Sequence, residues 1–214
     1  MKLIRKIAVF IFKALRNSQF ILFPIVTTIY CKIYLWLNGA EFSSLQCFGK
    51  PHIHLSLNAT LEIGRNFYMN NGIVNSGTGN NGKCKIDVSK GAKLTIGDFV
   101  GMSDVTILCQ NKITIKDNVK LGVGVHIYDS DFHSLNSEFR KNNIKDLLDI
   151  NTKPINIENN VFIGAHSIVL KGVTIGENSI VGAGSIVTKD IPKTQIWAGN
   201  PAKYIKIIDE KSFE

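Results

Sequence analysis

The chain has 214 residues, of which 44% are hydrophobic and 20% are charged, and its formal net charge is +8. This length and balance predict one globular domain with room for an appendage. Six basic residues and no acidic residue precede Glu41, so the first 40 residues carry +6 of that charge. The other 174 residues hold 19 basic and 17 acidic side chains, which argues against a nucleic-acid-binding groove in the main domain.

The four cysteines show no paired CxxC spacing, since they stand at positions 31, 47, 84 and 109. Such spacing predicts free, buried thiols rather than a zinc site. No small-residue cleavage site follows the first apolar run, so we expect no secretory signal. Both features favour a cytoplasmic location, where thiols stay reduced.

Residues 1–45 are expected to form a basic, amphipathic, helical extension. Apolar positions between Ile4 and Leu15 recur at helical spacing, with basic residues elsewhere around the helix. Three interpretations stay open: helices on an anionic membrane surface, a cap on the domain or on a partner subunit, and a membrane span over residues 20–37. Pro24 and Lys32 interrupt the apolar run, so the span is the least favoured of the three.

A six-residue repeat runs through the C-terminal part of the chain: IENNVF, IGAHSI, VLKGVT, IGENSI, VGAGSI, VTKDIP. Every unit begins with Ile or Val, and every fifth position is small or β-branched. A period of six matches neither a helix nor a simple strand alternation, and it indicates a repeat architecture. Three such units close a triangular coil in which the leading aliphatic side chains stack inside.

The same phase appears upstream, where similar tetrads open with Ile63, Ile96, Ile115, Ile157 and Ile175. Successive openings are separated by 33, 19, 42 and 18 residues. Only multiples near 18 fit uninterrupted coils, so two loop excursions are predicted, near residues 75–85 and 132–153. The β-helix domain would then cover residues 46–202, with a tail at 203–214.

These hexads, together with "IGAGSIVTKDIP" and "AGNPAKYIK", resemble the hexapeptide-repeat acyltransferases, most closely the galactoside and maltose O-acetyltransferase branch. The similarity covers most of residues 60–207 and is most specific over 154–206. It implies an all-β, left-handed parallel β-helix, a homotrimer, acetyl-coenzyme A as co-substrate, no metal, and active sites between neighbouring prisms. The N-terminal extension lies outside the match and is similar to variants that modify surface polysaccharides such as O-antigen or capsule.

The resemblance places the general base at His133, in the stretch "DSDFHSLNSEFR". The family's histidine is followed seven residues later by an arginine, which is Arg140 here. A histidine can accept the acceptor's proton near neutral pH. We expect its second ring nitrogen to be held by a backbone carbonyl, by Asp129 or by Asp131.

The family's binding residues are carried over position by position. Those for coenzyme A fall on Ala165, Ala183, Thr188, Lys189, Lys203 and Lys206. Those for the acceptor fall on Asn70 and its neighbour Asn71, although asparagine at coil corners is also a common structural device. The chain departs from the family by an extra coil at about residues 94–112.

The expected function is therefore acetylation of a saccharide hydroxyl, with a lipid-linked saccharide or a nucleotide sugar as acceptor. N-acetylation of an amino sugar nucleotide and a non-catalytic trimeric scaffold are the alternatives. A zinc site of the carbonic-anhydrase type would need three converging histidines, and the spacing of His126, His133 and His166 does not indicate one.

Overall fold

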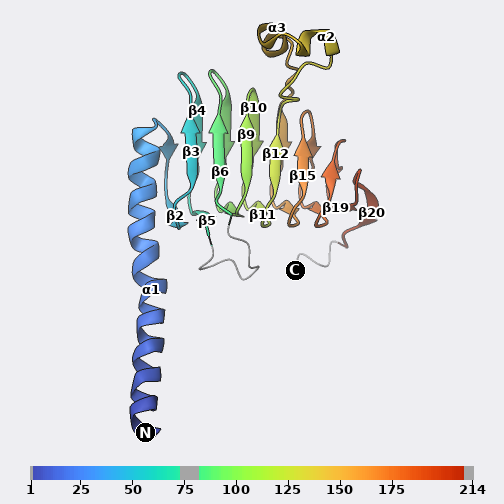
Figure 1. Ribbon diagram of the computed structural model, residues 1–214. Helices are drawn as coiled ribbons and strands as arrows, with labels where there is room; N and C mark the ends of the chain where they lie inside the picture. The colour runs from blue at the N-terminus through green and yellow to red at the C-terminus, as the bar shows by residue number, and fades with distance from the viewer. Residues whose placement is uncertain (1, 73–81, 210–214) are drawn as a thin grey trace.

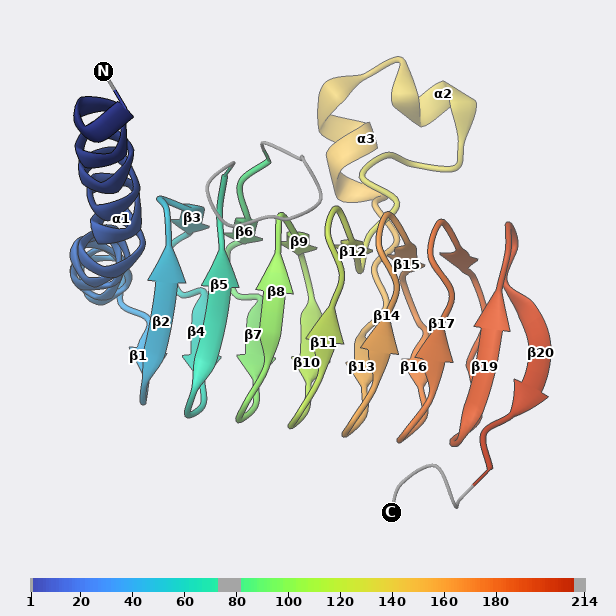
Figure 2. The ribbon, with the colours of Figure 1, turned by 90° about the horizontal axis from the view of Figure 1, so that it is seen from below.

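The structure is a computed structural model, and it describes residues 2–72 and 82–209. Figure 1 shows a long helix, α1 (Lys2–Leu37), lying across one end of a prism of stacked coils. Two short helices, α2 (Ser137–Arg140) and α3 (Asn143–Leu148), project from the prism close to β12 and β15 in both Figure 1 and Figure 2.

Three sheets form the faces of the prism, and successive strands pass from one sheet to the next. Sheet A contains β1 (Glu41–Phe42), β4 (Thr60–Ile63), β7 (Lys93–Ile96), β10 (Lys112–Ile115), β13 (Ile155–Ile157) and β16 (Thr174–Ile175). Sheet B contains β2 (Leu45–Phe48), β5 (Phe67–Asn70), β8 (Gly101–Ser103), β11 (Lys120–Leu121), β14 (Phe162–Ile163), β17 (Ile180–Val181), β19 (Gln195–Ala198) and β20 (Lys203–Ile207). Sheet C contains β3 (His52–Leu55), β6 (Lys85–Val88), β9 (Thr106–Cys109), β12 (His126–Tyr128), β15 (Ile168–Leu170) and β18 (Ile186–Val187).

The strand register confirms the hexapeptide phase. In sheet A, the predicted openings pair in one column, in the order Ile63, Ile96, Ile115, Ile157 and Ile175. Neighbouring strands are parallel throughout the described coils, except that β20 returns antiparallel to β19. The chain is therefore the expected parallel β-helix, closed at its C-terminal end by a hairpin.

The core is a column of side chains inside the prism. The leading positions of the C-terminal hexads are buried, and so are the fifth positions. Three of those fifth positions are serines, whose hydroxyls donate to backbone carbonyls, for example from Ser179 to Pro192 at 2.7 Å. Because the backbone supplies these acceptors, a buried hydroxyl is tolerated at the corner of a coil.

The long separation between Ile115 and Ile157 arises from the excursion between β12 and β13, which holds α2 and α3. The other predicted excursion, near residues 75–85, falls between β5 and β6 and lies largely outside the described residues.

The C-terminal half of α1 packs on β2 and covers the open end of the prism. Cys31 and Leu35 are buried there, and Thr27 Oγ1 donates to the Cys47 carbonyl at 2.6 Å. All four cysteines are free and buried. None of the helices among the described residues combines the length and hydropathy that a bilayer crossing requires.

Candidate active site

The loop that carries His133 leaves the prism after β12 and returns beside its own starting point. The Lys153 amide donates to the Asp129 carbonyl at 3.0 Å, and the Asp131 amide donates to the Asn151 carbonyl at 3.2 Å. These contacts close the base of the loop, so the rigid coil fixes the position of the backbone that leads to His133.

The two carboxylates expected to hold His133 are used elsewhere. Asp129 is fully buried, and its oxygens accept from the amides of Gln110 and Asn111 at 2.7 and 2.8 Å. It therefore joins two coils at this corner. Asp131 forms an ion pair with Lys171 at 3.0 Å. The expectation that either aspartate orients the imidazole is therefore corrected.

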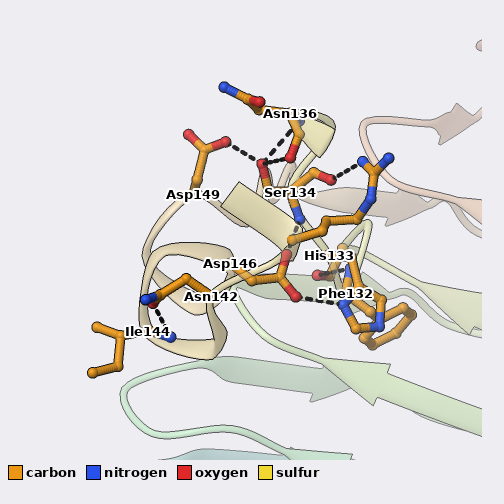
Figure 3. Close-up of polar contacts among 10 residues, drawn as sticks. Phe132, His133, Ser134, Asn136, Asn142, Ile144, Asp146 and Asp149 are labelled. Atoms are coloured by element: carbon orange, nitrogen blue, oxygen red, sulfur yellow. Dashed lines mark hydrogen bonds and ion pairs between the residues drawn. The ribbon is translucent and has the colours of Figure 1, made fainter. Parts of the chain in front are cut away.

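The partner of His133 is Asp146, from α3 (Figure 3). Nδ1 of His133 lies 2.7 Å from Oδ2 of Asp146, while Oδ1 accepts from the Ser134 amide at 2.7 Å. The hydrogen bond with His133, followed by that from Ser134, lowers the pKa of Asp146. An ionised carboxylate can only accept, so Nδ1 carries the proton in the neutral ring and Nε2 keeps its lone pair.

The free edge of this imidazole is accessible. The His133 side chain is 70% exposed, whereas that of Asp146 is 13% exposed. The imidazole therefore has Nδ1 hydrogen-bonded to a carboxylate and Nε2 available to a substrate. That is the geometry that a general base requires.

Local sequence explains why α3 stands where it does. Asn142 caps the helix by accepting from the Ile144 amide at 3.1 Å, and Asn136 caps α2 by accepting from the Glu138 amide at 2.9 Å. Such caps satisfy backbone donors that a short helix otherwise leaves open. They fix both helices and, through α3, the position of the Asp146 carboxylate.

Arg140 contacts the loop rather than the imidazole. Its Nη1 donates to the Ser134 carbonyl at 2.6 Å, next to His133 in the chain. Its positive charge also contributes to lowering the pKa of Asp146, after the hydrogen bonds of His133 and Ser134. A role in supporting catalysis remains a prediction for this residue.

The residues expected to bind coenzyme A lie on more than one edge of the prism. Thr188 and Lys189 follow β18 at the corner between sheets C and A, the same edge from which the His133 loop emerges. Ala165 and Ala183 lie at the corner between sheets B and C, stacked by a 2.8 Å bond from the Gly184 amide to the Ala165 carbonyl. Within one chain, His133 and the two alanines are therefore on different edges.

The remaining two donor candidates, Lys203 and Lys206, are exposed on β20. This strand lies at the far end of sheet B from α1 (Figure 2). The lysines are open to solvent and free to meet a phosphate there.

The two asparagines expected to bind the acceptor are buried at the end of β5, each 6% exposed. Asn71 accepts from the Cys84 amide at 2.8 Å and donates to the Phe48 carbonyl at 3.0 Å. Its amide group joins neighbouring segments of the backbone, which favours a structural role, and its assignment to the acceptor stays a prediction. Asn70 pairs in register with Ser103 on the next coil.

A hollow of about 240 Å³ lies on sheet C beside the base of the His133 loop. Its lining combines hydrogen-bonding groups with an aromatic ring and consists of Lys85, Asp87, Ser89, Leu108, Cys109, Gln110 and Phe132. Since Phe132 directly precedes His133, this hollow borders the residue next to the candidate base.

The three histidines of the zinc alternative do not share an edge. His166 lies at the corner between sheets B and C, while His133 is on the loop between sheets C and A. His126 begins β12, and burial lowers its pKa. Among residues 2–72 and 82–209, no group of three His, Cys, Asp or Glu side chains is arranged to hold a metal.

Comparison with known proteins agrees with the repeat and the fold. Residues 154–189 match the family profile described as the hexapeptide repeat of succinyl-transferase. Galactoside O-acetyltransferase of Escherichia coli is 35% identical over 162 residues, which cover 76% of this chain and 61% of the relative. A solved galactoside acetyltransferase in complex with coenzyme A is 31% identical, with a TM-score of 0.53, over 81% of this chain and 68% of that chain. The chain belongs to the hexapeptide-repeat acetyltransferases.

A second solved member of the hexapeptide-repeat acetyltransferases, from Vibrio cholerae O1 biovar eltor, is complexed with acetyl-coenzyme A. It is 28% identical, with a TM-score of 0.51, over 73% of this chain and 72% of that chain. The chain spans 52% to 61% of the length of the first curated relatives that it matches. Curated relatives matched over shorter stretches include N-acetyltransferases, one of them 55% identical over 60 residues, which cover 25% of that relative.

Asp146 is the residue of this hexapeptide-repeat acetyltransferase that the sequence did not reveal. It lies 13 residues after His133, among other polar residues, and no repeat phase extends into the loop. The Asn-rich stretch that caps α2 and α3 was the available signal, because it predicts ordered helices within the excursion.

Proposed function

We propose that the chain transfers an acetyl group from acetyl-coenzyme A to a hydroxyl group of a saccharide, with His133 as the general base. The observation that carries the proposal is the His133–Asp146 pair. In the neutral ring, this pair leaves Nε2 without a proton on a side chain that is largely exposed, while a carboxylate oxygen 2.7 Å from Nδ1 holds the other ring nitrogen. Membership of the hexapeptide-repeat acetyltransferases supports the donor, since two solved relatives hold coenzyme A or its acetyl form.

The reaction follows from these groups. Nε2 accepts the proton of the saccharide hydroxyl as its oxygen attacks the thioester carbonyl, and a tetrahedral intermediate forms. Collapse of the intermediate breaks the C–S bond and expels the coenzyme A thiolate, which receives the proton from the imidazolium. The products are an acetyl ester and free coenzyme A, and no covalent enzyme intermediate is needed.

Asp146 acts on the imidazole in this scheme. Its carboxylate selects the tautomer in which Nε2 is free, and its negative charge stabilises the imidazolium that exists between the two proton transfers. Backbone amides of a coil would stabilise the oxyanion of the intermediate.

A homotrimer completes the proposed site. His133 and the predicted donor residues Ala165 and Ala183 occupy different edges of one prism. Packing one edge against a different edge of a neighbouring copy would bring the base and the donor together in the cleft between them. The separation of the two groups within one chain supports this arrangement.

The hollow beside Phe132 is proposed as the acceptor site. It offers an ammonium, a carboxylate, hydroxyl and amide groups, and an aromatic ring, which together suit a sugar. N-acetylation of an amino sugar nucleotide is the second candidate, because the chain also matches N-acetyltransferases and Lys85 could meet a phosphate.

The proposed location is the cytoplasmic face of a membrane, in the synthesis of a surface polysaccharide. The six basic residues before Glu41 favour an anionic surface, and the four free cysteines fit a reducing compartment.

The test is acetyl transfer to a panel of nucleotide sugars and lipid-linked oligosaccharides, read by acceptor-dependent release of the coenzyme A thiol. O-acetyl products are esters and are released by mild alkali, whereas N-acetyl products are amides and survive it. Alkali-labile product supports the proposal. Alkali-stable product supports the second candidate, and no acceptor-dependent release with any acceptor would favour the non-catalytic scaffold.

A further inference from the structure

One side of α1 carries a long apolar stripe that the prism leaves uncovered. Its described members are at least 51% exposed and recur at intervals of three or four residues within each half of the helix. We call this set the outer stripe: Ile4, Ile7, Ile11, Leu22, Ile25, Ile29, Ile33 and Trp36.

The outer stripe lies on the side of α1 opposite the residues that bury the helix on the prism, although Ile25 and Ile29 also border a hollow beside β2. The buried residues that pack α1 on the first coil are Thr27, Cys31 and Leu35. Each stands two residues after a stripe residue, as Cys31 does after Ile29, and two residues correspond to a rotation of about 200° around an α-helix. The stripe and the packed side are therefore opposite sides of the same helix.

The same two sides continue into the N-terminal half of α1, which extends past the prism in Figure 1. Ile11 precedes Ile29 by 18 residues, which is five full helical turns, so both lie on one side. Lys13 precedes Cys31 by the same 18 residues, so a basic residue occupies the side opposite the stripe where the prism no longer covers it. The helix is amphipathic in this half, with a basic side and an apolar side.

We infer that α1 lies flat on the surface of an anionic bilayer, with the outer stripe at the boundary between headgroups and acyl chains. A basic amphipathic helix with an apolar side is the structure that binds there. Trp36 at the end of the stripe is of a residue type that favours this interface. A second copy of α1 is a poorer partner, because each copy brings six basic residues and no acidic residue, whereas anionic lipid neutralises them.

This docking sets the height of the active site. The coils follow one another away from α1 (Figure 1), and β12 is the fourth strand of sheet C from that end, after β3, β6 and β9. Three steps of about 4.8 Å between coils, with a helix about 10 Å thick beneath them, place His133 roughly 25 Å above the boundary between headgroups and acyl chains. The inference rests here on the proposed role of His133. The acceptor is then a lipid-linked saccharide modified several sugar units away from its lipid.

The docking surface is tested by flotation of the full chain with vesicles of phosphatidylcholine containing phosphatidylglycerol. The double variant Ile25→Glu, Ile29→Glu should bind at least ten-fold more weakly than the parent chain. The matched control, Leu57→Glu with Ile144→Glu, changes the same charge at two exposed aliphatic residues away from α1 and should bind like the parent. Sedimentation velocity on both variants shows whether each remains folded and keeps its oligomeric state.

Equal vesicle binding by the stripe variant and the control would overturn the inference. A stripe variant that loses oligomeric state but not vesicle binding would show that a second copy covers the stripe, and would also overturn it. The variant His133→Ala should float with vesicles like the parent. Vesicle binding therefore tests the docking surface independently of the proposed chemistry. The height is tested with lipid-linked acceptors of increasing sugar number: in vesicles only the longer ones should be acetylated, and equal acetylation of a one-sugar lipid would contradict it.

Discussion

Replacing Asp146 by Asn tests the proposed base most selectively, because the change removes a charge and keeps the shape. The Asn carbonyl can still accept from the Ser134 amide, as Oδ1 of Asp146 does at 2.7 Å. The Asn amide nitrogen would then face Nδ1 of His133. Since that nitrogen can only donate, Nδ1 must become the acceptor and Nε2 must carry the proton. The ring would stand in place as the wrong tautomer.

The expected loss is that of a general base, roughly 10²- to 10⁴-fold in kcat. The KM for acetyl-coenzyme A should change little, since Asp146 contacts the loop and the imidazole only in the contacts described. The assay is steady-state release of the coenzyme A thiol with a fixed acceptor. Glu138→Gln is the matched control, because it makes the same acid-to-amide change on the exposed side of α2. Unchanged kcat in Asp146→Asn would show that the tautomer of His133 does not depend on the Asp146 carboxylate.

Three further predictions concern the coil, the loop and the assembly. Gly164→Ala should lower stability by ~1–3 kcal/mol and Tm by ~2–12 °C, because the new Cβ would stand 2.5 Å from the Ala183 amide nitrogen. Gly101→Ala, which meets only the Lys120 side chain at 3.5 Å, should melt like the parent, and equal melting of the two variants would contradict the packing argument. The depressed pKa of Asp146 means that its contribution to stability is complete above the unfolded value of about 3.9 and disappears as pH falls through the lower folded value. Hydrogen exchange should therefore show the Ser134 amide still protected at about pH 3.9, and loss of protection at higher pH would contradict it. Co-refolded His133→Ala and Ala183→Trp chains should recover activity that neither has alone, while absence of recovery would place base and donor in the same chain.

The fold was predictable because each repeat unit carries its own pattern of inward-facing and outward-facing residues. Inward-facing positions return every six residues, so the column from Ile63 to Ile175 could be read directly from the spacing of aliphatic residues. The two separations that are not near a multiple of 18 residues, 33 and 42, located the excursions, because extra residues between two repeats must leave the coil. The repeat does not extend into the loop. There, the helix caps and the side-chain contacts determine which carboxylate meets His133.

The site was therefore only partly predictable. Asp129 and Asp131 stand four and two residues before His133 in the chain. Asp129 nevertheless accepts from backbone amides and Asp131 pairs with Lys171, whereas the carboxylate that meets the imidazole, Asp146, comes from α3. Asn71 shows the same limit, because an amide at a coil corner serves the backbone as readily as it serves a sugar. Sequence spacing places residues on an edge, whereas the partners of each polar atom depend on the packed structure.

In the proposed reaction, His133 removes the proton of the acceptor hydroxyl. Its most direct test is the turnover of His133→Ala with acetyl-coenzyme A and an acceptor, measured together with coenzyme A affinity by calorimetry. We expect a fall in kcat of roughly 10²-fold or more with nearly unchanged affinity for coenzyme A. Full turnover in that variant would contradict it.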